Sequence, residues 1–229
     1  MEHAKNTCLF AELGMIDYAT GVSIQKKLAQ ARSDQYIPDT VLSLEHNHTY
    51  TLGKRGTYSD ILVSNIFLEE LGVSIFQSER GGQVTYHGPG QIVIYPIIDV
   101  RPIGGPVKYV RLLEQLIIHT LNDFGVHGER KPGLTGVWVG DAKIAAIGLK
   151  ISRGISTHGF ALNVNTDLSY FDHIIPCGDS QLRHTSMAEL TGTNIHQSDV
   201  SSNIIKNFSN MFGRCMEKAH QQLFDMTHI

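Results

Sequence analysis

The chain has 229 residues, of which 41% are hydrophobic and 18% are charged. This length fits one large domain or two small ones, and the composition excludes a collagen-like, coiled-coil or disordered chain. No repeat, low-complexity tract or linker-like change of composition divides the sequence. We therefore expect residues 1–229 to form a single domain.

The net charge of -3 is small, and basic residues cluster only in short pairs. Nucleic-acid binders usually carry a basic stripe, so we expect no nucleic-acid partner. A small basic face could still attract an acidic carrier protein, because electrostatic steering depends on local charge. No stretch approaches 18 apolar residues, and we therefore expect no membrane span.

Three cysteines, Cys8, Cys177 and Cys215, occur without a CxxC pair. The N-terminal segment shows neither the apolar run of a signal peptide nor an Arg-rich amphipathic leader. A reducing, cytoplasmic setting is the simplest interpretation of these features.

The first half of the chain predicts one helix and two strands. Asp17 can cap a helix that runs to about Gln35, with apolar positions at Val22, Ile24, Leu28 and Ala31. Residues 39–45 predict a strand. Residues 91–100 predict another, whose apolar run is typical of a buried central strand.

The second half of the chain predicts two helices around a run of strands. Pro106 suits the first turn of a helix and Gly125 its C-terminal stop. Between them apolar residues recur at helical spacing: Val110, Leu113, Ile117, Leu121 and Phe124. Further strands are predicted over 136–140, 142–152 and 155–165, with a hairpin corner at 139–142 and a last helix from Ser198 or Asp199 to Phe212. Together these elements predict an α+β fold with a mixed or antiparallel sheet.

A glycine-rich segment, Arg80 to Gln91, interleaves polar and aromatic side chains with four glycines and a proline. Glycine allows the backbone to approach a ligand closely, so this stretch could form a pocket wall. A tight turn between two strands explains it about equally well. The spacing is neither GxGxxG nor a Walker loop, and the chain therefore shows no recognisable ATP-binding loop.

Two further segments hold candidate reactive groups. Lys143 stands among small and apolar residues, where loss of hydration could lower its pKa. For a lone lysine, however, the pattern itself favours a strand lysine that faces solvent. Cys177 lies between Pro176 and Gly178, in a rigid and uncrowded turn that could present a thiol. The alternative is a buried structural cysteine, which is how we interpret Cys8 and Cys215.

The twelve histidines suggest a metal site, but the closest pair, His46 and His48, has no HExxH or cysteine pair to support it. We expect no metal and no cofactor. His158, which precedes Gly159-Phe160-Ala161, could lie near a pocket.

Three segments follow one another in this order: RGGQVTYHGPGQ, then GxxKIAAIG with the following THGFALN, then PCG. Together they resemble the lipoyl(octanoyl) transferase family. The resemblance covers roughly residues 40–190. It implies the fold of biotin and lipoate protein ligase catalytic domains, with Cys177 as the acyl-thioester nucleophile and Lys143 as the residue that activates it. It also implies these substrate-binding residues: Arg80, Gly81, Gly82, Gln83, Val84, Thr85, Tyr86, His87, Ala146, Ile147, Gly148, Gly159, Phe160 and Ala161.

The same resemblance implies the substrates. The octanoyl donor would be acyl carrier protein, and the acceptors would be lipoyl domains of 2-oxoacid dehydrogenase complexes and the glycine cleavage H protein. A tunnel of small residues would hold the acyl chain: Gly82, Ala145, Ala146, Gly148 and Ala161. Three alternatives remain open, namely an ATP-dependent lipoate or biotin ligase, a cysteine hydrolase that pairs Cys177 with His87 or His158, and a non-catalytic acyl-binding protein.

Overall fold

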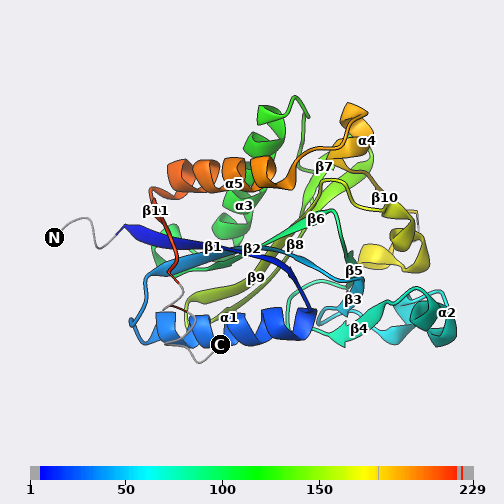
Figure 1. Cartoon of the computed structure of the whole chain (residues 1–229), viewed down its shortest axis with the longest axis horizontal. Helices are drawn as coiled ribbons and strands as arrows, with labels where there is room; N and C mark the ends of the chain where they lie inside the picture. Colours follow the sequence, from blue (N-terminus) through cyan, green and yellow to red (C-terminus); the bar gives the residue numbers. More distant parts are fainter. Residues whose placement is uncertain (1–5, 180, 221–222, 224–229) are drawn as a thin grey trace.

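The computed structural model describes residues 6–179, 181–220 and 223, and for Cys177 the backbone alone. A mixed sheet forms its centre, with the strand order β10-β8-β9-β6-β2-β1-β11 and β7 paired to β8 (Figure 1). Its strands are β1 (Thr7–Ile16), β2 (Asp39–His46), β6 (Gln91–Ile97), β7 (Val137–Val139), β8 (Ala142–Ser152), β9 (Ile155–Asn163), β10 (Arg183–His184) and β11 (Cys215–Lys218). No helix in the described part of the chain is long and apolar enough to cross a membrane.

Helices cover both faces of this sheet. In Figure 1, α1 lies below the sheet and α3 and α5 lie above it. The helices are α1 (Tyr18–Ser33), α2 (Asn65–Glu70), α3 (Pro106–Asp123), α4 (Met187–Thr191) and α5 (Gln197–Phe212). The predicted α+β class with a mixed sheet is confirmed, since β1 pairs with β2 and β11 in parallel while β6, β8 and β9 pair antiparallel.

Strand β6 shows why the run at 91–100 is apolar throughout. Ile92 and Ile94 pack in the core under α3 and α5, whereas Val93 and Tyr95 pack in the core against α1. A strand covered on both faces has no polar side to its alternation. The strand ends at Ile97, earlier than predicted, because the chain then turns into the short helix η3 (Arg101–Ile103).

The predicted helices are confirmed to within a few residues. Asp17 caps α1 by accepting a hydrogen bond from the Thr20 backbone N–H at 2.8 Å, and the helix ends at Ser33. Helix α3 begins at Pro106 as predicted. Helix α5 begins at Gln197, one residue before the predicted start. The hairpin corner at 139–142 is also confirmed, with Gly140 at a φ of +55°.

A smaller three-stranded sheet escaped prediction. Its order is β4-β3-β5, with β3 (Thr49–Leu52), β4 (Ser74–Gln77) and β5 (Val84–His87). Each strand has four residues, which is too short for an alternating pattern to stand out. Three short helices border this part of the fold: η2 (Tyr58–Asp60), η4 (Leu168–His173) and η5 (Pro176–Gly178).

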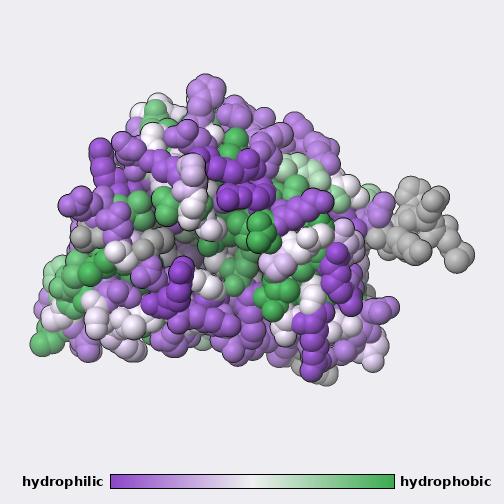
Figure 2. All heavy atoms as spheres, turned by 180° about the vertical axis from the view of Figure 1, so that it is seen from behind, coloured by the Kyte–Doolittle hydropathy of each residue, from purple (hydrophilic) through white to green (hydrophobic). Residues whose placement is uncertain are grey.

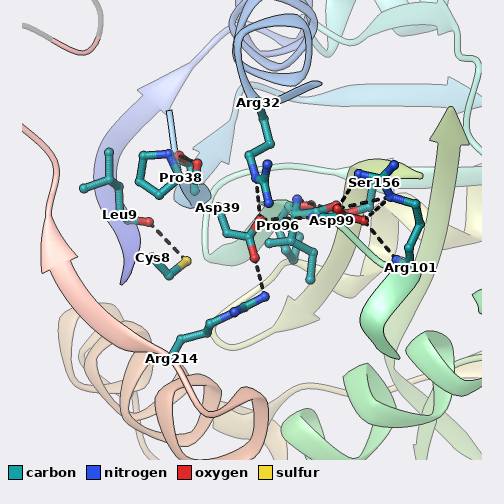
Figure 3. Close-up of polar contacts among 12 residues, drawn as sticks. Cys8, Leu9, Arg32, Pro38, Asp39, Pro96, Asp99, Arg101, Ser156 and Arg214 are labelled. Atoms are coloured by element: carbon teal, nitrogen blue, oxygen red, sulfur yellow. Dashed lines mark hydrogen bonds and ion pairs between the residues drawn. The ribbon is translucent and has the colours of Figure 1, made fainter. Parts of the chain in front are cut away.

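A cluster of ion pairs and hydrogen bonds centres on Asp39 (Figure 3). Asp39, 3% exposed at the start of β2, accepts from Arg32 Nε at 2.7 Å and from Arg214 Nη2 at 2.6 Å. Its Oδ1 also accepts from the Asp99 backbone N–H at 3.0 Å. The cluster therefore ties the C-terminal ends of α1 and α5 to the sheet, and Cys8 lies beside it.

Candidate active site

One cavity, called here the central cavity, is lined by residues of all three sequence motifs. It lies where the glycine-rich segment and β5 meet strands β6, β8 and β9 on the α1 side of the large sheet. The motif residues that line it are Arg80, Gly82, Gln83, Val84, Thr85, His87, Lys143, Ala146, Ile147, Gly148, His158, Gly159, Phe160, Ala161 and Pro176. The fold thus assembles in one place segments that are far apart in the sequence.

Arg80 fastens the glycine-rich segment to β3. Its guanidinium donates from Nη2 to the Thr51 carbonyl at 2.6 Å and to the Gln83 carbonyl at 2.8 Å, and from Nε to Thr51 Oγ1 at 3.2 Å. A Cβ at Gly148 would lie 3.0 Å from Arg80 Cδ, so this glycine of β8 leaves room for the arginine. The buried charge of Arg80 therefore holds the segment in shape as part of the cavity wall.

Lys143 lines the cavity from β8 and is only 5% exposed, so it does not face solvent. Its Nζ lies 5.2 Å from the centroid of the Trp138 ring, within the range of a cation–π interaction. Gly136 has a φ of +132°, and a Cβ on it would lie 2.7 Å from Lys143 Cε. The absence of a side chain at this position leaves room for the lysine. The lysine is therefore held in one confined position.

His184 lies beside Lys143 because β10 pairs in parallel with β8, and sequence reasoning missed it. Its ring stacks on Phe171 with 3.7 Å between centroids. Burial, helped by the positive charge of Lys143, lowers the pKa of His184 to about 3. The imidazole is therefore neutral at physiological pH and can accept or donate a hydrogen bond at the cavity wall.

Cys177 lies in the turn η5, between Pro176 and Gly178. Pro176 lines the cavity, and a Cβ at Gly178 would lie 2.8 Å from Gln83 Nε2. The side chain of Cys177 lies outside the described part of the chain. Its contact with Lys143 thus stays a prediction.

Some residues expected at the site lie elsewhere. Tyr86 points away from the cavity into the core of the smaller sheet, where its hydroxyl lies 2.8 Å from His48 Nδ1. Gly81 is absent from the cavity lining and donates its N–H to the Leu149 carbonyl. Ala145, expected in the tunnel wall, packs instead in the core under α3 and α5.

The end of the cavity around His158, which pairs with Leu149 of β8 six residues along the strand from Lys143, is called here its deep end. Residues that the motifs did not include complete the cavity lining. Tyr18 comes from the first turn of α1, Val93 and Tyr95 come from β6, and all three are buried. The alternation of β6 could have placed Val93 and Tyr95 on one face. No signal in the sequence pairs α1 with this site, because the contact is made only by the fold.

Neutral histidines surround this deep end. Burial lowers the pKa of His46 and of His158 to about 4, and it lowers that of His87 well below its ordinary value. His46 Nδ1 faces the Ile16 carbonyl at 2.9 Å and must carry the proton, so Nε2 accepts from the Tyr95 hydroxyl at 2.7 Å. This bond fixes the orientation of Tyr95 in the cavity wall.

The histidine pair that suggested a metal site is divided between two tyrosines. His46 bonds Tyr95, whereas His48 bonds Tyr86 in the smaller sheet. Among the described residues, no group of three or more His, Cys, Asp and Glu side chains could hold a metal ion.

The two other cysteines lie away from the cavity. Cys8 is fully buried in β1, and burial, with the nearby Asp39 carboxylate, raises the pKa of its thiol (Figure 3). A protonated, buried thiol is a poor nucleophile. The prediction that Cys215 is buried is wrong, because it stands at the start of the edge strand β11 and is exposed.

An apolar patch, formed by Leu62, Ile66 and Phe67, is exposed next to the segment that leads into η5. The green spheres at the lower left of Figure 2 mark the end of the molecule that carries α2. The Leu62 N–H donates to the His173 carbonyl at 2.8 Å, which joins the patch to that segment. Exposed apolar patches are typical of surfaces that contact other molecules.

Comparison with known proteins agrees with this geometry. An octanoyltransferase of Solibacter usitatus is 49% identical over 91% of this chain and 94% of its own length. An octanoyltransferase of Roseiflexus sp. is 47% identical over 90% of this chain and 88% of its own. These relatives confirm the predicted enzyme class, an acyltransferase.

Solved structures confirm the predicted fold. Lipoate-protein ligase A bound with ATP aligns with a TM-score of 0.76 at 15% identity, over 98% of this chain and 93% of the other. Biotin protein ligase from Aquifex aeolicus aligns with a TM-score of 0.57 at 15% identity, over 90% and 70%. The lipoyl protein ligase A/B catalytic domain matches residues 17–209. The chain therefore belongs to the lipoyl protein ligase A/B catalytic domain family.

Proposed function

We propose that this enzyme transfers an octanoyl group from the thioester of acyl carrier protein to the acceptor lysine of lipoyl domains, through a thioester on Cys177. The lipoyl domains would be those of 2-oxoacid dehydrogenase complexes and the glycine cleavage H protein. The observation that carries the proposal is one cavity that residues of all three motifs line, among them Arg80, Lys143 and Pro176, the residue before Cys177. The octanoyltransferase relatives support the same reaction.

In the first half-reaction the Cys177 thiolate attacks the thioester carbonyl of the donor. An ordinary thiol is only a few per cent ionised at neutral pH, so a nearby cation is needed to favour the thiolate. Lowering its pKa by two units requires about 2.7 kcal/mol. The confined ammonium of Lys143 is the candidate cation. A new sulfur–acyl bond forms and the bond to the carrier sulfur breaks. The carrier leaves as its thiol by taking a proton from the Lys143 ammonium.

In the second half-reaction the ε-amine of the acceptor lysine attacks the Cys177 thioester. Acylation has removed the negative charge of the sulfur, so the Lys143 ammonium loses its partner and is easier to deprotonate. Lys143 can then take the proton from the attacking amine as a general base. The amide forms and the cysteine sulfur is released. Because a thioester lies above an amide in free energy, the transfer needs no nucleotide.

The apolar part of the cavity suits an acyl chain. Val93, Phe160 and Ala161 contribute apolar lining on the large sheet. Seven apolar carbons would gain roughly 5–6 kcal/mol of gross driving force on burial, at about 0.8 kcal/mol per methylene. The exposed patch of Leu62, Ile66 and Phe67 lies beside the entry to η5, where the protein substrates would have to approach.

Intact-protein mass spectrometry tests the proposal directly. The chain is mixed with octanoyl acyl carrier protein, without ATP and without acceptor. We expect a gain of one octanoyl mass that is absent in Cys177→Ser, is retained in Cys8→Ser and Cys215→Ser, and is removed by a lipoyl domain. The two control cysteines lie outside the cavity lining, so their loss should not affect the adduct.

The same experiment separates the alternatives. An adduct that persists in Cys177→Ser would end the proposed mechanism. Labelling of the lipoyl domain that requires ATP and free octanoate would indicate a ligase. Release of free octanoate without an acceptor would indicate a hydrolase.

A further inference from the structure

A second cavity, called here the α1 cavity, lies between α1 and the hairpin of β8 and β9. It is wide, about 360 Å³, whereas the central cavity is narrow, about 60 Å³. The two cavities share two lining residues, Tyr18 and His158. These two side chains therefore stand where the deep end of the central cavity meets the α1 cavity.

Tyr18 is held rigidly in this position. It is 3% exposed, and its hydroxyl lies 2.7 Å from Ser78 Oγ. Its ring stacks on His87 with centroids 6.2 Å apart and meets His46 edge-on at 5.2 Å. A ring fixed on several sides cannot swing aside without breaking these contacts.

His158 reaches the same boundary through an unusual backbone conformation. Its φ of +58° lies in the left-handed region, although it stands in the middle of β9. Regular alternation would direct it toward the α3 side with Phe160, but its ring instead contacts Tyr95 edge-on at 6.1 Å. Its N–H donates to Gln25 Oε1 of α1 at 2.5 Å. Strained backbone of this kind is concentrated at functional sites.

Beyond these two residues the surroundings become polar. Gln25, 2% exposed, lines the α1 cavity, and its Nε2 has no hydrogen-bond partner among the described residues. Lys26, Lys150 and Arg153 add positive charges, and Glu79 adds a carboxylate that pairs with Lys150 at 2.7 Å. An apolar chain end that entered this cavity would meet polar groups in place of the apolar wall that precedes them.

We propose that Tyr18 and His158 form the floor of the acyl site and set the upper limit on acyl chain length. The inference rests on the proposed function, because it assumes that the central cavity holds the acyl chain. The rings stop the chain sterically, and the polar α1 cavity disfavours a chain end that passes them. Replacing either ring with a small side chain joins the narrow cavity to the wide one.

The test compares His158→Gly and Tyr18→Ala with the wild-type chain. Glycine adopts the positive φ at position 158 without strain, so this variant is expected to fold even if Tyr18→Ala does not. Octanoyl, decanoyl and dodecanoyl carrier proteins serve as donors, and the ratio of kcat/KM for decanoyl over octanoyl is measured. We expect it to rise at least tenfold, since each newly buried methylene favours binding about fourfold.

Lys26→Ala is the matched control. It enlarges the α1 cavity and removes one of its charges but leaves both rings in place. Because the chain end does not pass intact rings, we expect the ratio to stay at the wild-type value. Folding of all variants is checked by circular dichroism. An unchanged ratio in a folded His158→Gly that still transfers octanoyl would overturn the inference.

Calorimetric titration with octanoate, decanoate and dodecanoate separates this inference from the proposed function, because it needs no thioester chemistry. If His158→Gly binds longer fatty acids than the wild-type chain does, the result supports the floor, even if the wild-type chain forms no octanoyl adduct. A length limit that stays fixed counts against the floor, whatever the outcome of the transfer assay.

Discussion

The side chain of Lys143 lies against Gly136, a position whose backbone conformation and close neighbours favour glycine. A Cβ on Gly136 would lie 2.6 Å from the Ala145 carbonyl and 2.7 Å from Lys143 Cε, and the φ of +132° is itself unfavourable for other residues. The lysine is therefore placed by a missing side chain as much as by its contact with Trp138. A sequence motif that contains the lysine but not Gly136 does not reveal this contribution.

We predict that Gly136→Ala lowers kcat/KM for octanoyl transfer at least tenfold, equivalent to about 1.4 kcal/mol, by displacing Lys143 from its position. Gly140→Ala is the matched control, because this glycine also has a positive φ but a Cβ there would meet open space. Transfer rates of both variants, measured beside their urea unfolding, check this. Equal rates in the two variants would show that the position of Lys143 does not limit the reaction.

Arg80 supports a second prediction at the same scale. Its removal would take a donor from the Thr51 carbonyl and from Thr51 Oγ1, and one of the two donors from the Gln83 carbonyl. We expect Arg80→Met to lower the free energy of unfolding by about 3 kcal/mol, as measured by urea denaturation. The exposed Arg55→Ala should change it by less than about 0.5 kcal/mol. Comparable losses in the two variants would contradict a clamping role for Arg80.

At the scale of elements, the length of a helix or strand determined whether the sequence could predict it. Helices α1, α3 and α5 and the continuous apolar run of β6 are long enough to predict, and the structure has them to within a few residues. The four-residue strands of the smaller sheet carry no such pattern. The glycine-rich segment, which the sequence predicts as a pocket wall or a turn, contains the alternating strand β5. That alternation turns Thr85 and His87 toward the cavity and Tyr86 away from it.

The contact between β6 and β9 depends on one glycine. A Cβ on Gly159 would overlap the Ile94 carbonyl oxygen in the neighbouring strand, in the middle of the large sheet. We predict that Gly159→Ala lowers the free energy of unfolding by about 3 kcal/mol, the upper range for overpacking. Gly81→Ala is the control, since a Cβ there meets the Leu149 carbonyl at an ordinary 3.5 Å. Urea denaturation that finds both variants equally stable would contradict the close approach of these strands.

At the scale of the molecule, the central cavity unites residues from α1, the glycine-rich segment, both sheets and η5. The motifs found most of its lining. Tyr18, Val93, Tyr95 and His184 could not be found from the sequence, because each reaches the cavity only through the packing of its element. Several histidines around the central cavity are buried in the neutral form, so the stability of the molecule depends on pH.

His46 and His158 have pKa values of about 4, and His184 one of about 3, all lowered first by burial. In the unfolded chain a histidine titrates near pH 6.5. Between the folded and unfolded values only the unfolded chain binds the proton, so acid favours unfolding. The stability is complete above about pH 6.5 and is lost as the pH falls toward 4. Each such histidine contributes a slope of about 1.4 kcal/mol per pH unit.

We predict that the free energy of unfolding falls steeply between pH 6.5 and 4.5, in urea titrations at closely spaced pH values. His46→Gln should reduce this slope by up to about 1.4 kcal/mol per pH unit, because glutamine can still donate to the Ile16 carbonyl and accept from Tyr95 but does not titrate. The exposed His119→Gln should leave the slope unchanged. Aspartates whose pKa is lowered, such as Asp99, lose their contribution to stability only below about pH 4. They therefore add little to the change between pH 6.5 and 4.5. A flat stability profile above pH 4.5 would show that these histidines accept protons within the folded chain, and their neutral state at the cavity would then have to be abandoned.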